Sequence, residues 1–107
     1  MTDFKQIDAQ GAKELIGRGN LTVVDIRDMQ SYFEAHIPGA VSVTEENVPD
    51  FIKTADRNIP LICYCYHGIS SQGAAQFFIQ NGFKDVYSIQ GGFEEWRGRF
   101  PTASGDS

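Results

Sequence analysis

Residues 61–70 read Leu61-Ile62-Cys63-Tyr64-Cys65-Tyr66-His67-Gly68-Ile69-Ser70. The apolar run at residues 61–64 predicts a buried strand, and residues 70–80 predict a helix. Cys65 therefore lies at the mouth of a strand–loop–helix turn. Backbone amides of such a loop can point inward, and the helix dipole adds roughly half a positive charge at its N-terminus. We expect the pKa of the Cys65 thiol to lie below about 8.5, the value of free cysteine, so that Cys65 acts as a nucleophile.

Length and charge limit the classes of protein that this chain can be. Its 107 residues predict one domain with one hydrophobic core. The net charge of -5 and the lack of a basic stripe argue against nucleic acid as a partner. The sequence has no apolar stretch long enough to cross a bilayer and no signal-peptide pattern, so we expect no membrane partner, a cytoplasmic location and reduced thiols.

Cys63 and Cys65 are the two cysteines of the chain, and they stand two residues apart on a predicted strand. Their side chains share a face, but their Cβ atoms would lie too far apart for a relaxed disulfide, which needs about 4 Å. We expect Cys63 to pack in the apolar strand. The histidines, His36 and His67, lack the spacing of a zinc site relative to the cysteines, so we expect no metal and no cofactor.

Strands alternate with helices along the sequence, which predicts an α/β fold: a single domain with a central, mostly parallel β-sheet of about five strands and helices on both faces. The expected domain spans residues 1–101, and residues 102–107 are expected to form a frayed tail because they offer nothing to bury. Ligands of such folds bind beyond the carboxyl ends of the strands, where we expect Cys65. The expected strands open at Ile7 and cover residues 21–26, 41–43, 61–64 and 85–89, and the expected helices follow Asp8 and Asp28, cover residues 49–53 and 70–80, and follow Gly91-Gly92.

Four short motifs follow one another along the chain between residues 4 and 101. They are Val24-Asp25-Ile26-Arg27, Ala35-His36-Ile37-Pro38-Gly39-Ala40, Cys65-Tyr66-His67-Gly68-Ile69-Ser70-Ser71 and Gly91-Gly92-Phe93-Glu94-Glu95-Trp96. In this order and spacing they resemble the rhodanese family, and within it the single-domain thiosulfate sulfurtransferases of the GlpE type. One motif departs from the family pattern, because Ala35 stands where the family has a glycine.

The resemblance implies a sulfur-transfer mechanism centred on Cys65. Its thiolate takes the outer sulfur of thiosulfate, releases sulfite, and passes the sulfur from a persulfide to cyanide or to a dithiol protein such as thioredoxin. Physical chemistry agrees, because a ring of amide donors stabilises an anionic sulfur and a cysteine of low pKa needs no general base. The resemblance also implies that the Ser70 hydroxyl donates a hydrogen bond to the sulfur. The implied substrate-binding residues are those of the loop: Tyr66, His67, Gly68, Ile69 and Ser70.

Two residues directly after the cysteine differ from those of some relatives, which place basic residues there to hold thiosulfate. Here Tyr66 offers a hydroxyl, and His67 can carry a charge near its pKa. The resemblance therefore implies a weak hold on thiosulfate. His67 is either a substrate-side group or a solvated loop residue.

Three further polar residues are expected to support the loop. Asp25 and Arg27 stand two apart on a predicted strand, so they share a face and can bond loop backbone at the active edge. Direct contact of Arg27 with the substrate anion is the alternative. His36 is expected to make local hydrogen bonds that fix the turn at Pro38-Gly39.

Other functions would use a similar loop. A phosphatase or arsenate reductase needs an arginine at the far end of the loop to clamp a tetrahedral oxyanion, and Ser71 stands there instead. A module that only binds a partner would not need Cys65. A sulfur carrier with a dedicated protein donor or acceptor would have the same sequence features, so it is the alternative to a thiosulfate sulfurtransferase.

Overall fold

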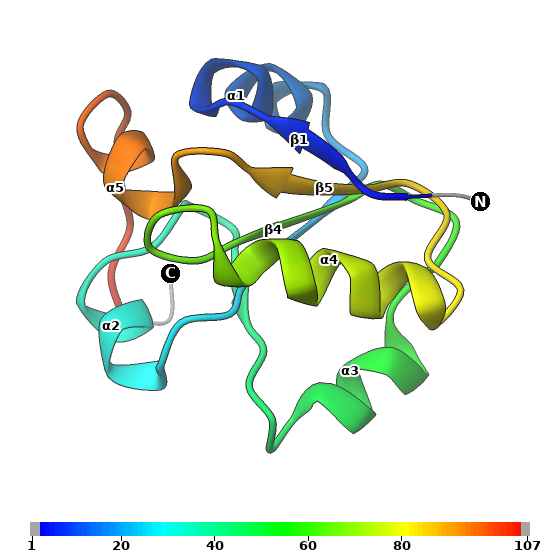
Figure 1. Ribbon diagram of the computed structural model, residues 1–107. Coiled ribbons are helices and arrows are strands. Elements are labelled where there is room, and N and C mark those ends of the chain that lie inside the picture. The colour runs from blue at the N-terminus through cyan, green and yellow to red at the C-terminus, as the bar shows by residue number, and fades with distance from the viewer. Residues whose placement is uncertain (1–2, 106–107) are drawn as a thin grey trace.

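Five short strands form one parallel sheet in the computed structural model, which describes residues 3–105 (Figure 1). The strand order is β1-β5-β4-β2-β3, and every neighbouring pair is parallel. The α/β class and the parallel five-stranded sheet expected from the sequence are thus confirmed. The strands are β1 (Lys5–Ile7), β2 (Thr22–Asp25), β3 (Val41–Ser42), β4 (Leu61–Tyr64) and β5 (Val86–Ile89).

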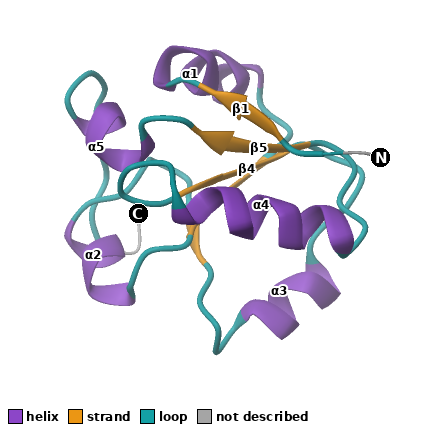
Figure 2. Cartoon of the chain, in the orientation of Figure 1, coloured by secondary structure: helices purple, strands orange, loops and turns teal. Residues whose placement is uncertain are grey.

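Helices cover both faces of the sheet (Figure 2). One apolar cluster joins α1, α2 and α5 to one face, and a second joins α3 and α4 to the other. This two-sided cover explains why the central strands read as continuous apolar runs. The helices are α1 (Ala9–Arg18), α2 (Met29–Glu34), α3 (Val48–Thr54), α4 (Ser70–Gln80) and α5 (Gly92–Arg97). Within residues 3–105, none of the helices has both the length and the apolar character needed to cross a membrane.

Strand β4 lies at the centre of the sheet, between β5 and β2, and all four of its residues are buried. Ile62 belongs to the cluster beneath α1 and α5, whereas Cys63 belongs to the cluster beneath α4 and is 0 % exposed. The expected packing role of Cys63 is therefore confirmed. Cys65 follows at the carboxyl end of the strand, where the chain turns toward α4.

Aspartates begin two of the helices, as the sequence predicts. The side chain of Asp8 accepts the Gly11 amide at 2.7 Å at the start of α1, and that of Asp28 accepts the Ser31 amide at 3.0 Å at the start of α2. Each satisfies a backbone donor that has no partner inside the helix.

Two expectations about the chain ends are corrected. Strand β1 ends at Ile7 rather than opening there. The expected frayed tail is paired with the body as far as residue 105, because the backbones of His36 and Ala103 exchange two hydrogen bonds of 2.9 Å and the Gly105 amide donates to the Phe33 carbonyl at 2.8 Å. Backbone pairing needs no apolar side chain, so composition gave no sign of it. Residues 106 and 107 lie outside the described residues.

Candidate active site

The loop between β4 and α4 surrounds the sulfur of Cys65 with hydrogen-bond donors. The Gly68 amide lies 3.2 Å and the Ser71 amide 3.3 Å from Sγ, and both donate to it. Cys65 is 6 % exposed, so it is buried within its own loop, beyond the carboxyl end of the central strand β4. Its surroundings are backbone N–H groups that point inward, not an apolar interior.

Helix α5 holds this loop in place, and Figure 1 shows the loop beside the start of that helix. The Phe93 amide donates to the Cys65 carbonyl at 2.8 Å, and the Glu94 amide donates to the Tyr66 carbonyl at 3.0 Å. These amides belong to the first turn of α5, where no intrahelical partner exists. Because a planar trans peptide points its C=O and N–H in opposite directions, the Tyr66 carbonyl that faces α5 turns the His67 amide the other way, and that amide is among the groups that stabilise the Cys65 thiolate.

Two glycines permit the close approach of these backbones. Gly92 has φ +62°, and a Cβ atom there would lie 2.4 Å from the Tyr66 carbonyl oxygen. Gly68 has φ +88°, and its Cβ would lie 2.1 Å from the Gln90 carbonyl oxygen. A side chain at either position would be strained and would also push the loop away. Within the Gly91-Gly92 motif, Gly92 thus allows α5 to pack against the loop.

The serine that reaches the sulfur is Ser71, not Ser70 as expected. Ser71 is 0 % exposed, and its hydroxyl lies 3.5 Å from Cys65 Sγ in addition to the amide contact. Ser70 is exposed at the start of α4. The phase of the first helical turn decides which of two adjacent serines faces inward, and the sequence signal for both was the same.

The two cysteines differ in their tendency to ionise. Burial opposes ionisation of Cys65, but hydrogen bonds from the Ser71 hydroxyl and from the amides of Ser71, Gly68 and His67 bring the pKa of its thiol below the ordinary value. Burial and the nearby charge of Cys65 raise the pKa of Cys63 to about 12. At neutral pH only Cys65 can supply a thiolate.

Tyr66 and His67, the two residues directly after Cys65, are both exposed. The Tyr66 hydroxyl is hydrogen-bonded to the Ser31 hydroxyl and lies 3.3 Å from Asp28 Oδ1, both at the start of α2. It therefore anchors the loop to α2, and its expected role in holding substrate stays a prediction. His67 is exposed, and its amide is among the groups that stabilise the Cys65 thiolate.

Asp25 and Arg27 form a buried ion pair next to the loop. Arg27 Nη2 lies 2.7 Å from Asp25 Oδ2, and the two side chains are 3 % and 0 % exposed. The guanidinium also lies 4.2 Å from the centre of the Phe93 ring and 5.2 Å from that of Tyr66. These contacts place Arg27 beneath the loop and α5 and neutralise its charge with Asp25, which fits the expected supporting role better than direct contact with an anion.

His36 lies between α2 and the C-terminal segment. Its ring stacks on Tyr32 with 3.9 Å between ring centres, and its Nδ1 lies 2.7 Å from the Tyr32 carbonyl oxygen. Its backbone pairs with Ala103. Support of the Cys65 loop by His36 stays a prediction.

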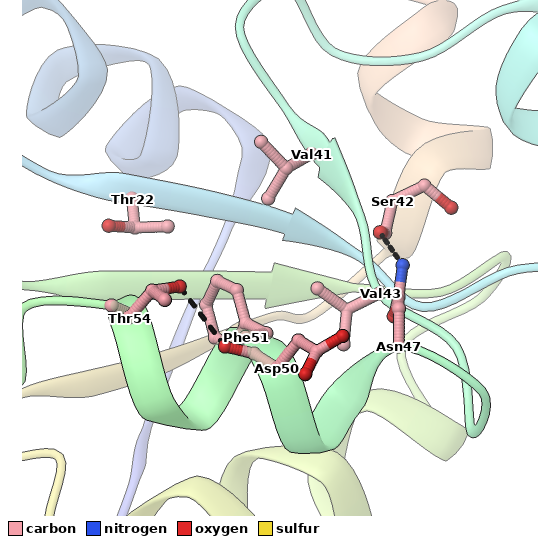
Figure 3. Close-up of a pocket in the computed structure, with 9 residues that line it drawn as sticks. Thr22, Val41, Ser42, Val43, Asn47, Asp50, Phe51 and Thr54 are labelled. Atoms are coloured by element: carbon pink, nitrogen blue, oxygen red, sulfur yellow. Dashed lines mark hydrogen bonds between the residues drawn. The ribbon is translucent and has the colours of Figure 1, made fainter.

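A pocket of about 360 Å³ lies between β3 and α3, away from Cys65 (Figure 3). Apolar side chains such as Val43 and Phe51 line it together with Thr22, Thr54 and one carboxylate, that of Asp50. Its lining holds neither a cysteine nor a histidine. We therefore locate the candidate active site at the Cys65 loop rather than at this pocket.

Comparison with known proteins agrees with the fold and with the motifs. The family model described as a rhodanese-like domain matches residues 8–99, and this chain belongs to the rhodanese-like family. It is 46 % identical to the thiosulfate sulfurtransferase GlpE of Pseudomonas putida, over 100 % of this chain and 99 % of that protein. It is 49 % identical to the protein of the same name from Pseudomonas aeruginosa, over 97 % of this chain and 96 % of that protein.

A solved structure shows the same architecture. The crystal structure of the BH2092 protein from Bacillus halodurans superposes with a TM-score of 0.79 at 30 % sequence identity, over 94 % of this chain and 77 % of that chain. The family resemblance inferred from the four motifs is thus confirmed.

Proposed function

We propose that this protein is a thiosulfate sulfurtransferase that carries sulfur on Cys65 as a persulfide. The observation that carries the proposal is the pair of inward amides, of Gly68 and Ser71, at 3.2 and 3.3 Å from a sulfur whose pKa is lowered. The names of the two Pseudomonas relatives support the choice of thiosulfate as donor.

The first half-reaction loads the cysteine. The Cys65 thiolate attacks the outer sulfur of thiosulfate, a new S–S bond forms, and the sulfur–sulfur bond of thiosulfate breaks. Sulfite leaves with the bonding electron pair. No proton moves, because the nucleophile is already ionised and the leaving group is an anion, so no general base is required.

The second half-reaction removes the added sulfur from Cys65. Cyanide or the thiolate of a dithiol protein attacks the terminal sulfur, and Cys65 leaves as a thiolate. The amides that stabilise the free thiolate are then again in place to receive its charge. Because Cys65 is 6 % exposed, the attacking atom must be small or must project from its molecule, which suits cyanide or an exposed cysteine of a thioredoxin-like protein.

The loop has no group of the kind that a phosphatase needs. Residues 65–71 contain no arginine, and the nearby Arg27 is held by Asp25. A tetrahedral oxyanion would therefore lack the bidentate clamp that its chemistry uses.

Intact mass spectrometry after brief exposure to thiosulfate tests the proposal. We expect the wild type and Cys63→Ser to gain one sulfur atom, mapped to Cys65, and Cys65→Ser to gain none. Sulfur uptake by Cys65→Ser would overturn the assignment. A steady-state assay with thiosulfate and cyanide separates the carrier alternative, since a carrier would be loaded with sulfur but would turn over poorly.

A further inference from the structure

A second buried serine lies behind Ser71. The Oγ atoms of Ser71 and Ser88 are 2.7 Å apart, and both residues are 0 % exposed. Ser88 lies on β5, directly opposite Cys63 of β4 in the sheet register. With Ser71 Oγ 3.5 Å from Cys65 Sγ, the three atoms form a hydrogen-bonded chain from the sheet to the sulfur.

The protons of this chain can be arranged in two ways. If Ser71 donated to Ser88, the Ser88 proton would need a further acceptor, yet within residues 3–105 the partner of Ser88 Oγ is Ser71. A buried hydroxyl without an acceptor loses the hydrogen bond that it would make to water and gains none in the folded protein, which costs free energy of folding. The arrangement that pairs every donor runs from Ser88 to Ser71 to Cys65, and it requires the sulfur to be an acceptor.

We propose that Ser88 is a positioning residue that makes the Ser71 hydroxyl donate to the sulfur of Cys65, and so favours the thiolate over the thiol. Ser88 touches neither the sulfur nor a substrate. The Ser88 hydroxyl donates to Ser71 Oγ, so the Ser71 hydroxyl does not donate to Ser88. The Ser71 proton is then available to the sulfur of Cys65. The proposal rests on the proposed function in that it concerns the same cysteine.

Other ionisable groups lie in the loop or on elements packed against it, and the test leaves each of them unchanged. Cys63 lies beneath the loop, His67 belongs to it, and the remaining groups lie on the elements packed against it. They are Asp25 at the end of β2, Arg27 after it, Asp28 before α2, and Glu94 and Glu95 on α5, together with Tyr66 of the loop itself.

The test measures the ionisation of Cys65 without thiosulfate. The rate at which iodoacetamide alkylates Cys65 is followed against pH by peptide mass spectrometry in the wild type, Ser88→Ala, Ser71→Ala and the double variant. The matched control is Ser42→Ala, since within the described residues the buried Ser42 Oγ has no hydrogen-bond partner. Thermal unfolding of each variant reports whether the fold is kept.

We expect the pKa of Cys65 to rise in both single variants. At a fixed pH below the wild-type pKa, alkylation should fall about tenfold in Ser71→Ala and about threefold in Ser88→Ala, because Ser88 acts through another group. The double variant should match Ser71→Ala alone. Ser88→Thr, which restores a hydroxyl, should recover the wild-type profile, and Ser42→Ala should keep it.

Three outcomes would overturn the proposal: an unchanged profile in Ser88→Ala, a double variant whose effect is the sum of the two single ones, or an equal shift in Ser42→Ala. Each of these would show that Ser88 does not act through Ser71. Failure of the proposed function is distinguishable, because it would leave the wild type without added sulfur after thiosulfate while the alkylation profiles still follow the expected order.

Discussion

Hydrogen-bond donors, not burial, distinguish the two cysteines of this protein. Cys63 lies in β4 and Cys65 just beyond its end, and both are buried. The thiol of Cys63 faces carbonyl oxygens, those of Ser71 at 3.4 Å and Tyr87 at 3.5 Å, which accept a proton but cannot stabilise a negative charge. The sulfur of Cys65 faces amides and a hydroxyl, which do. A shift of two residues along the strand thus changes a packing group into a nucleophile.

The two thiols should couple stability to pH with opposite sign. The lowered pKa of Cys65 means that its contribution to the unfolding free energy is present above the unfolded value of about 8.5 and is lost as pH falls through the folded pKa. Burial raises the pKa of Cys63 to about 12, so its contribution is fully present below about 8.5 and is lost as pH rises toward about 12.

Urea unfolding of Cys65→Ala and Cys63→Ala between about pH 6 and about pH 10 measures this difference. The stability advantage of the wild type over Cys65→Ala should grow with pH, whereas that over Cys63→Ala should shrink above about pH 8.5. Slopes of the same sign for both variants would contradict the assignment of the two environments.

At the scale of elements, the site is the joint between the β4–α4 loop and α5. The first amides of α5 donate to the carbonyls of Cys65 and Tyr66, which fixes the start of the loop and the orientation of the His67 amide. Helix α5 is therefore part of the site although none of its side chains bonds to Sγ in the described structure. The small residue at position 92 is what lets the two backbones meet.

Replacing Gly92 with alanine should separate these elements. The new Cβ would meet the Tyr66 carbonyl oxygen at 2.4 Å in a backbone with φ +62°. We expect a loss of about 1–3 kcal/mol in unfolding free energy and slower alkylation of Cys65 at neutral pH. Denaturant unfolding and iodoacetamide kinetics measure the two effects.

Gly17→Ala is the matched control for that change. Gly17 lies in α1, and an added Cβ would meet nothing within 4 Å. Alanine should stabilise the helix there by up to about 1 kcal/mol and leave Cys65 unaffected. If both substitutions had the same effect on stability and alkylation, the close approach at Gly92 would not be what holds the loop.

At the scale of the whole molecule, the C-terminal segment joins the body through backbone hydrogen bonds. The His36–Ala103 bridge and the bond from the Gly105 amide to Phe33 lie beside α2, the helix whose start anchors Tyr66. Deleting residues 102–107 should therefore lower the unfolding free energy by about 1–3 kcal/mol, at about 1 kcal/mol for each lost bond. Thermal or urea unfolding measures it, with Thr102→Ala as the control that keeps the backbone. Equal stability of the truncated and full chains would contradict a structural role for this segment.

Signals within a few residues of one another made much of this protein predictable. The apolar run at residues 61–64 predicted the central strand, and the aspartates at positions 8 and 28 predicted two helix starts. These features depend on local backbone geometry and on the spacing of apolar residues, so they can be recognised in a single stretch of sequence without information on its tertiary contacts. The order of the four motifs predicted the family, and the loop motif at residues 65–71 predicted the place of Cys65.

The partners of the sulfur required the folded chain. Ser71 rather than Ser70 faces Cys65 because the first turn of α4 has one phase relative to the sheet, and Ser88 lies behind it because β5 pairs with β4 in one register. Likewise Ala103 meets His36 through backbone atoms that are the same in every residue. Contacts between segments distant in sequence depend on packing geometry, and no pattern within either segment encodes them.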